Sequence, residues 1–206
     1  MTGSAFKTSE GHVETGEIDV AVAMRLEALK INQALGSRMG IANDSGRLAA
    51  LYIRQGDLDQ AEKMFSQAIE IEQSLGRSDN LARHCADLAR LNLSRGNLDR
   101  AENLVRQSLE IDLASGCREK AAQSYRDLAI IMGLRDDLEE AENLLLGLVE
   151  IEKGHSDKKS LAEALGRLAA VRLRRGAPAQ AENVLAQAEQ IYRELDDTSG
   201  MADTQG

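Results

Sequence analysis

Three histidines and Cys85 of this chain are of residue types that could bind a metal ion. Two of the histidines stand alone in the sequence, and the third is followed directly by this cysteine. His84 and Cys85 follow each other directly, so on a helix their side chains point about 100° apart and cannot share a metal ion. His12 and His155 have no partner at the spacing that metal ligands need. We therefore expect no metal site.

Four glutamates resemble candidate catalytic carboxylates, but they recur every 40 residues: Glu62, Glu102, Glu142 and Glu182. Such recurrence suits the positive N-terminal end of a repeated helix better than a single active site. The sequence also lacks a phosphate-binding loop, a nucleophile motif and a dinucleotide fingerprint. We expect neither an enzyme nor a cofactor.

Each of these glutamates closes a short phrase that recurs along the chain. The phrase reads GDLDQAE from Gly56, and related copies start at Gly96, Asp136 and Gly176, with a weaker copy at Gly16. Self-similarity at a period of about 20–50 residues is typical of a solenoid, in which each unit buries its apolar face only against its neighbours.

One repeat reads as two helices. Apolar residues follow helical spacing over about 43–55, which we name helix A, and a second helix, helix B, follows to about residue 75. Gly56 separates the two helices, and Asp57 is placed to cap helix B. A small residue marks the point where the two helices approach most closely in each unit: Ala61, Ala101, Ala141 and Ala181.

The composition and net charge argue against several classes of protein. The net charge of −9 argues against general nucleic-acid binding, and no apolar run is long enough to span a membrane. The first ten residues lack the apolar core of a signal peptide, so we expect a cytoplasmic protein. Cys85 and Cys117 form no disulfide pattern, and we expect both to be reduced thiols.

The repeat resembles the tetratricopeptide repeat. Residues of the first full unit match that family's pattern in order: Leu48, Ala49, Tyr52, Gly56, Ala61, Phe65 and Ala68. The unit is longer than the usual ~34 residues, which is similar to the repeats of the Pins and rapsyn adaptor group and of kinesin light chains. The resemblance implies an all-α fold, a right-handed α-solenoid of stacked antiparallel helix pairs, and a peptide-binding adaptor.

The expected organisation is an array over residues 16–200. It begins with a half-repeat, and the full repeats follow: 16–40, 41–80, 81–120, 121–160 and 161–200. Residues 1–15 are expected to be poorly ordered or degenerate, and residues 201–206 to be the start of a truncated repeat or a disordered tail. Without a helix A before residues 17–35, we expect part of the first helix to be uncovered: Ile18, Met24, Leu29 and Ile31. Solenoids normally end in polar caps, so we expect either a fragment of a longer protein or a homo-oligomer joined through its ends.

Charge divides between the two helices of each unit. The four helix A windows hold eleven basic and four acidic residues, whereas the helix B windows hold five basic and sixteen acidic residues. In the family helix A lines the concave side, so an acidic protein or peptide is the expected partner. The alternative is that these arginines are solvated or pair with acids of adjacent helices.

The resemblance carries over to particular positions of helix A. The candidate partner-binding residues are Asn43, Arg54, Arg83, Arg90, Leu93, Gln123, Arg126, Ile130, Leu134 and Arg174. A second hypothesis is a regulatory or sensor module of a larger signalling or transcription protein, which acts through self-association or by stacking on a neighbouring domain.

Overall fold

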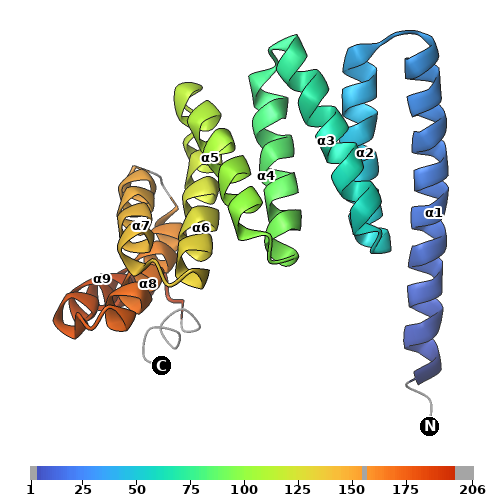
Figure 1. Cartoon of the computed structure of the whole chain (residues 1–206). Coiled ribbons are helices and arrows are strands. Elements are labelled where there is room, and N and C mark those ends of the chain that lie inside the picture. Colours follow the sequence, from blue (N-terminus) through green and yellow to red (C-terminus); the bar gives the residue numbers. More distant parts are fainter. Residues whose placement is uncertain (1–3, 155–156, 198–206) are drawn as a thin grey trace. The chain divides into compact units, whose positions relative to one another are not determined.

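The computed structural model of the chain describes residues 4–154 and 157–197, and for residues 4–15 it describes the backbone only. Within these residues the secondary structure is entirely helical, with nine α-helices and no strand. The helices divide into two compact units, residues 1–97 and 98–206 (Figure 1). The predicted all-α fold of stacked helix pairs is confirmed in each unit.

The first unit contains four helices, each packed against the next: α1 (Ser4–Ala34), α2 (Arg38–Gln55), α3 (Leu58–Leu75) and α4 (Ser78–Ser94). The predicted helix A of the first full repeat is α2, and the predicted helix B is α3. Helix α2 begins earlier than its apolar pattern indicated, because the Ser37 side chain accepts a hydrogen bond from the backbone N–H of Gly40 at 3.2 Å.

The second unit contains five helices: α5 (Leu98–Ala114), α6 (Arg118–Leu134), α7 (Leu138–Lys153), α8 (Lys158–Arg174) and α9 (Pro178–Glu194). Here too each helix packs against the one that follows. In the order of the repeat, α6 and α8 are helices A, and α5, α7 and α9 are helices B.

The turns follow the chemistry that the repeated phrase predicted. Asp57 and Asp137 accept hydrogen bonds from the backbone N–H groups of Gln60 and Glu140 at 3.1 and 3.2 Å. Pro178 stands in the first turn of α9, where its missing N–H costs no helical hydrogen bond. Asp136 replaces the glycine of the phrase and takes its left-handed conformation, with φ at 62°.

The core runs between neighbouring helices. The four alanines of predicted closest approach, at 61, 101, 141 and 181, are fully buried. The leucines that repeat along helix A are buried as well: Leu48, Leu88, Leu128 and Leu168. Each unit therefore has a thin apolar core that depends on contact between adjacent helices.

The N-terminal helix differs from the expectation. It continues through Gly16, so the weak copy of the phrase makes no turn, and residues 17–34 belong to one helix that starts at Ser4. Ile18 and Leu29 were expected to be uncovered but are buried against Leu48 of α2. Met24 and Ile31 are exposed as expected, at 70% and 54%.

Parts of the prediction fall outside the described residues, namely the repeat start at 201–206 and His155. None of the described helices combines the length and apolar character needed to cross a membrane.

Gly46 lets α2 and α4 approach each other. A Cβ atom at this position would overlap the imidazole ring of His84, which is buried. At the equivalent position of α8, Gly166 has no atom within 4 Å of an added Cβ. The two glycines occupy the same place in the repeat but differ in the space around them.

We expect Gly46→Ala to lower the free energy of unfolding by about 1–3 kcal/mol, because the added methyl group overpacks the contact with His84. Gly166→Ala is the matched control and should raise it by roughly 0.5–1 kcal/mol through helix propensity alone. Urea denaturation of both variants measures the difference. Equal effects of the two substitutions would show that the His84 contact imposes no constraint.

Candidate functional site

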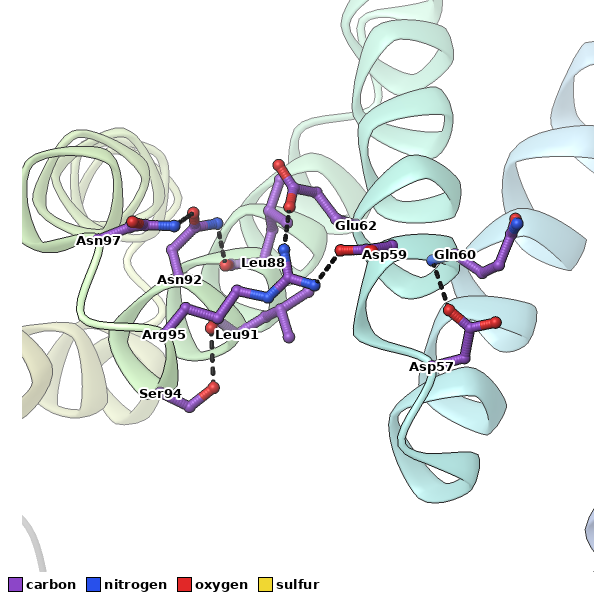
Figure 2. Close-up of polar contacts among 10 residues, drawn as sticks. All are labelled: Asp57, Asp59, Gln60, Glu62, Leu88, Leu91, Asn92, Ser94, Arg95 and Asn97. Carbon is purple, nitrogen blue, oxygen red and sulfur yellow. Dashed lines mark hydrogen bonds and ion pairs between the residues drawn. The ribbon is translucent and has the colours of Figure 1, made fainter.

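The arginine that ends helix A binds the helix B before it. Arg95 follows α4, and its guanidinium donates to Glu62 and Asp59 in the first turns of α3, at 2.6 Å each (Figure 2). A cation at the C-terminal end of one helix thus meets anions at the N-terminal end of another, and both helix dipoles favour this arrangement.

The same contact recurs in the second unit. Arg135 after α6 pairs with Glu102 and Asp99 of α5, and Arg175 after α8 pairs with Glu142 of α7. Glu142 also accepts a hydrogen bond from Arg172 at 2.8 Å. We call Arg95, Arg135 and Arg175 the bridge arginines, because each joins two successive repeats.

The pKa values of the bridged carboxyl groups reflect this pairing. Burial alone would raise the pKa of Glu102, but hydrogen bonds from Arg106 and Arg135 outweigh it, and the pKa is lowered. The pKa of Glu142 is lowered against burial in the same way by Arg172 and Arg175. These glutamates are therefore ionised structural partners, which gives them a larger role than the helix-dipole effect expected from the sequence.

The helix A arginines consequently fall into two classes. The alternative that these residues pair with acids of adjacent helices holds for the bridge arginines, for Arg172 and for Arg126, which pairs with Glu152 of α7. Arg174 likewise pairs with Asp136 in the turn after α6. Among the described residues, no ion pair is formed by the exposed side chains of Arg47, Arg54, Arg83 and Arg167. Only this second class is available to hold a ligand without breaking an internal ion pair.

A groove of about 280 Å³ lies in the second unit, lined mainly by α6 and α8. Its floor and walls carry Arg126, Ile130, Leu134, Arg167 and Arg174, together with small residues of both helices. The structure thus brings together four of the predicted partner-binding residues and adds Arg167. We call this the α6–α8 groove.

Two of the three arginines in the α6–α8 groove are held by the protein. Arg126 donates to the buried carboxylate of Glu152 at 2.5 Å and to Gln123 at 3.0 Å. Arg174 donates to Asp136 at 2.8 Å and to the carbonyl oxygen of Gly133. These contacts fix the two side chains at the groove, while Arg167 has no such anchor among the described residues.

A second cavity of about 600 Å³ lies between α1 and α2 in the first unit. Arg54, a predicted residue, lines it with Arg47 and Arg25, beside apolar residues that include Met24. Arg25 is paired with the buried Asp44 at 3.0 Å. The cavity combines positive charge with apolar surface, as the α6–α8 groove does.

The other predicted residues line neither of these cavities. Arg83 and Arg90 are exposed on α4, where Arg90 pairs with Asp87 one turn away, and Leu93 is half-buried. Gln123 is half-buried and bridges Arg126 to Asp127. Asn43 is half-buried on α2. These residues therefore stay predicted partner-binding residues outside the two cavities.

Sequence reasoning did not single out Arg47 and Arg167, each of which lines one of the two cavities. They occupy equivalent positions in the first and last full repeats, and in the two repeats between these the same position holds Asp87 and Asp127. The acids have partners at this position, Arg90 and Gln123, whereas the arginines have none among the described residues. Comparing this one position across the four repeats would have identified them.

The histidine and cysteine pair is part of the core. His84 is buried 6.1 Å from the ring of Phe65, and neither ring nitrogen has a hydrogen-bond partner among the described residues. Cys85 is buried, which raises the pKa of its thiol to about 12, and Cys117 is a half-buried free thiol. Within residues 4–154 and 157–197, no group of three or more His, Cys, Asp and Glu residues could hold a metal ion.

Comparison with known families agrees with this fold. Residues 40–114 match the sequence model of the tetratricopeptide repeat family. No curated protein sequence matches the chain.

Solved structures extend the likeness over most of the chain. BtubC from P. vanneervenii is similar with a TM-score of 0.80 and 23% identity, over 89% of this chain and 76% of that chain. The kinesin light chain TPR-like repeats from Podosopora anserina are similar with a TM-score of 0.74 and 21% identity, over 92% and 93%.

A third similar structure is a signal transduction ATPase with a tetratricopeptide repeat sensor from Pyrococcus horikoshii. Its TM-score is 0.76 at 16% identity, over 88% of this chain and 28% of that chain. At these identities the comparisons establish a common fold. The resemblance to tetratricopeptide repeats, including those of kinesin light chains, is confirmed.

The burial of His84 makes stability depend on pH. Burial, the positive charge of Arg83 and, to a lesser degree, that of Arg77 lower the pKa of His84 from 6.5 to about 4, against the opposite effect of Asp87. A histidine with a lowered pKa in the folded state stabilises the fold above its unfolded pKa. This contribution is lost as the pH falls from about 6.5 to 4.

We expect His84→Phe, which keeps a ring in the core, to remove this loss. Between pH 7 and pH 4 the wild-type protein should lose up to about 3 kcal/mol more unfolding free energy than the variant. Thermal unfolding followed by circular dichroism at several pH values measures the difference. Parallel pH profiles for the two proteins would contradict the assignment of this effect to His84.

Proposed function

Because the chain folds as a tetratricopeptide repeat protein, we propose that it is a non-enzymatic protein-interaction scaffold whose helix A surface binds an extended, acidic peptide. The observation that carries this proposal is the α6–α8 groove, where three arginines surround apolar side chains on neighbouring helices A. The overall net charge of −9 makes this local concentration of positive charge distinctive.

Arg167 is the residue that we assign to the ligand carboxylate. Its guanidinium can form two parallel hydrogen bonds with a carboxylate, and charge-assisted pairs of this kind are the strongest polar contacts available to a peptide. Among the described residues it has no ion pair to break first, so binding costs only the ordering and partial desolvation of one exposed side chain.

Apolar contacts complete the proposed site. Ile130 and Leu134 lie one turn apart on α6 and are exposed, so they can cover an apolar side chain of the ligand next to its acidic residue. Arg126 and Arg174 are held in place by Glu152 and Asp136. They add positive potential without losing these partners.

A second candidate function is that of a sensor module within a larger signalling protein. The observation that favours it is the likeness to the repeat sensor of the Pyrococcus horikoshii ATPase, of which this chain spans only 28%. In that case the same surface would bind a neighbouring domain, and isolated acidic peptides would bind weakly or not at all.

We expect Arg167→Glu to weaken the binding of an acidic peptide at least tenfold, because a carboxylate then faces a carboxylate. Fluorescence anisotropy with a labelled peptide of roughly ten residues, carrying Asp and Glu beside Leu and Phe, measures this. The affinity for the wild-type protein should fall as salt is raised.

The matched control is Arg193→Glu. Arg193 is exposed on α9, lines neither cavity and pairs with Glu189 of its own helix. It changes the net charge by the same amount, so it should leave peptide binding within about twofold if the effect is local. A peptide in which Lys replaces the acids should not bind. Equal losses for both variants, or binding of the basic peptide, would contradict the proposed site.

A further inference from the structure

The cavity between α1 and α2 is not used by the function proposed above. It has a volume of about 600 Å³, and we call it the α1–α2 cavity. Two helices alone line it, with Ala21, Met24, Arg25 and Ala28 from α1 and Arg47, Ala50, Leu51 and Arg54 from α2. A concave surface of this size with apolar walls and a few polar groups is typical of a binding site.

The wall that α2 contributes matches the wall that α8 contributes to the α6–α8 groove. Four residues of α8 line that groove: Arg167, Ala170, Val171 and Arg174. Each of them lies three periods of 40 residues after one of the four α2 residues that line the α1–α2 cavity. Both stretches begin with the same five residues, GRLAA, at Gly46 and at Gly166. From the first arginine to the second, buried and exposed positions also follow the same order on the two helices.

The two repeats between α2 and α8 lack this pair of arginines. Asp87 and Asp127 stand at the position of Arg47, and neither repeat has an arginine at the position of Arg54. Among the four full repeats, the basic and apolar wall therefore occurs once in each of the two units.

We propose that the α1–α2 cavity is a second binding site for an acidic segment that carries an aromatic side chain, so that the protein holds two acidic segments, one in each unit. The proposal rests on the proposed function for the chemistry of its ligand, but it concerns other residues and has its own test.

Two arginines of α2 supply the positive charge. Arg47 and Arg54 are two turns apart on one face of the helix, about 10 Å along its axis. Both are exposed, and neither forms an ion pair among the described residues. Arg25 is already paired with Asp44 at 3.0 Å. The cavity thus has two positive charges available for acidic residues of a ligand.

The wall that α1 contributes leaves room for an aromatic side chain. Ala21 and Ala28 are small, and Met24 between them is 70% exposed, whereas Ile130 and Leu134 form the facing wall of the α6–α8 groove. The α1–α2 cavity is accordingly the larger one, at about 600 Å³ against about 280 Å³. A methionine side chain adapts to the shape of a ring, and contact between its sulfur atom and an aromatic edge is favourable.

The second site should be the weaker of the two. Asp136 holds Arg174 at the α6–α8 groove, whereas Gly16 stands at the equivalent position three periods earlier and gives Arg54 no such anchor. Binding at the α1–α2 cavity therefore has to order its arginines, and the ligand contacts two helices instead of three. We expect an affinity at least about tenfold below that of the α6–α8 groove. Arg167→Glu alone thus still lowers the binding measured at low peptide concentration.

Nuclear magnetic resonance of methionine methyl groups observes the second site directly. Met24 lines the α1–α2 cavity, and the described residues that line the α6–α8 groove include no methionine. Protein with isotope-labelled methionine methyl groups is titrated with the acidic peptide that carries Phe, and Met24→Leu identifies the Met24 signal. We expect this signal to shift at peptide concentrations above those that saturate the α6–α8 groove, in the wild type and in Arg167→Glu alike. A peptide in which Ala replaces Phe should need at least about threefold more.

Arg47→Glu should raise the peptide concentration required for the Met24 shift at least about tenfold, because a carboxylate then faces the acids of the peptide. Arg54→Glu should act in the same direction, and it replaces the first variant if circular dichroism shows that the first is unfolded. Both variants should keep the binding measured by fluorescence anisotropy, which reports the α6–α8 groove, within about twofold. Lys63→Glu is the matched control, because Lys63 is exposed on α3 and lines neither cavity.

Three results would overturn the second site. They are a Met24 signal that does not move up to millimolar peptide, a shift that neither arginine variant weakens, and an equal shift with the peptide in which Lys replaces the acids. If Arg167→Glu still weakens binding in the anisotropy measurement, these results leave the proposed function in place. A Met24 shift that depends on Arg47, in a protein whose binding Arg167→Glu does not weaken, would support the α1–α2 cavity and contradict the site assigned to the α6–α8 groove.

Discussion

Close approach of neighbouring helices at one repeated alanine is the constraint on which this structure depends. Ala61, Ala101, Ala141 and Ala181 are fully buried, so the helices on either side come near enough to cover each other's apolar faces. Within each of the two units, each described helix packs mainly against the next along the chain.

Electrostatics then decides which charged residues hold the fold and which are available to a partner. The bridge arginines lie at the ends of helices A and meet glutamates of the preceding helix B, where helix dipoles and partial burial favour the pair. Arg47 and Arg167, farther back along helices A, line the two cavities and have no such partner among the described residues. A basic surface within an acidic protein is thus smaller than a count of arginines suggests. It is also more specific, because only a few positions combine exposure, positive charge and neighbouring apolar side chains.

The helices and turns were predictable because their signals are local. Asp57 and Asp137 cap their helices through hydrogen bonds three residues away, and Gly76 takes the left-handed conformation that ends α3. The same logic explains the failure at Gly16, where Glu17 stands in place of the capping Asp or Asn and the helix continues. Which arginines form ion pairs could not be predicted in this way. Their partners lie 33 and 36 positions away in the sequence, and the helical periodicity within one repeat does not reveal such contacts. Of the predicted site, Arg126, Ile130, Leu134 and Arg174 meet in one groove, because they recur on adjacent helices A.

The bridge between Arg95 and Glu62 has the same sequence offset as the bridge between Arg135 and Glu102 and that between Arg175 and Glu142. Each bridge therefore joins one 40-residue repeat to the repeat before it in the same way. If a whole period of 40 residues were duplicated or deleted, every remaining arginine would still find a glutamate at the proper distance. Genes that encode such a chain can gain or lose units without passing through an intermediate with mismatched charges, so the number of repeats is open to evolutionary change.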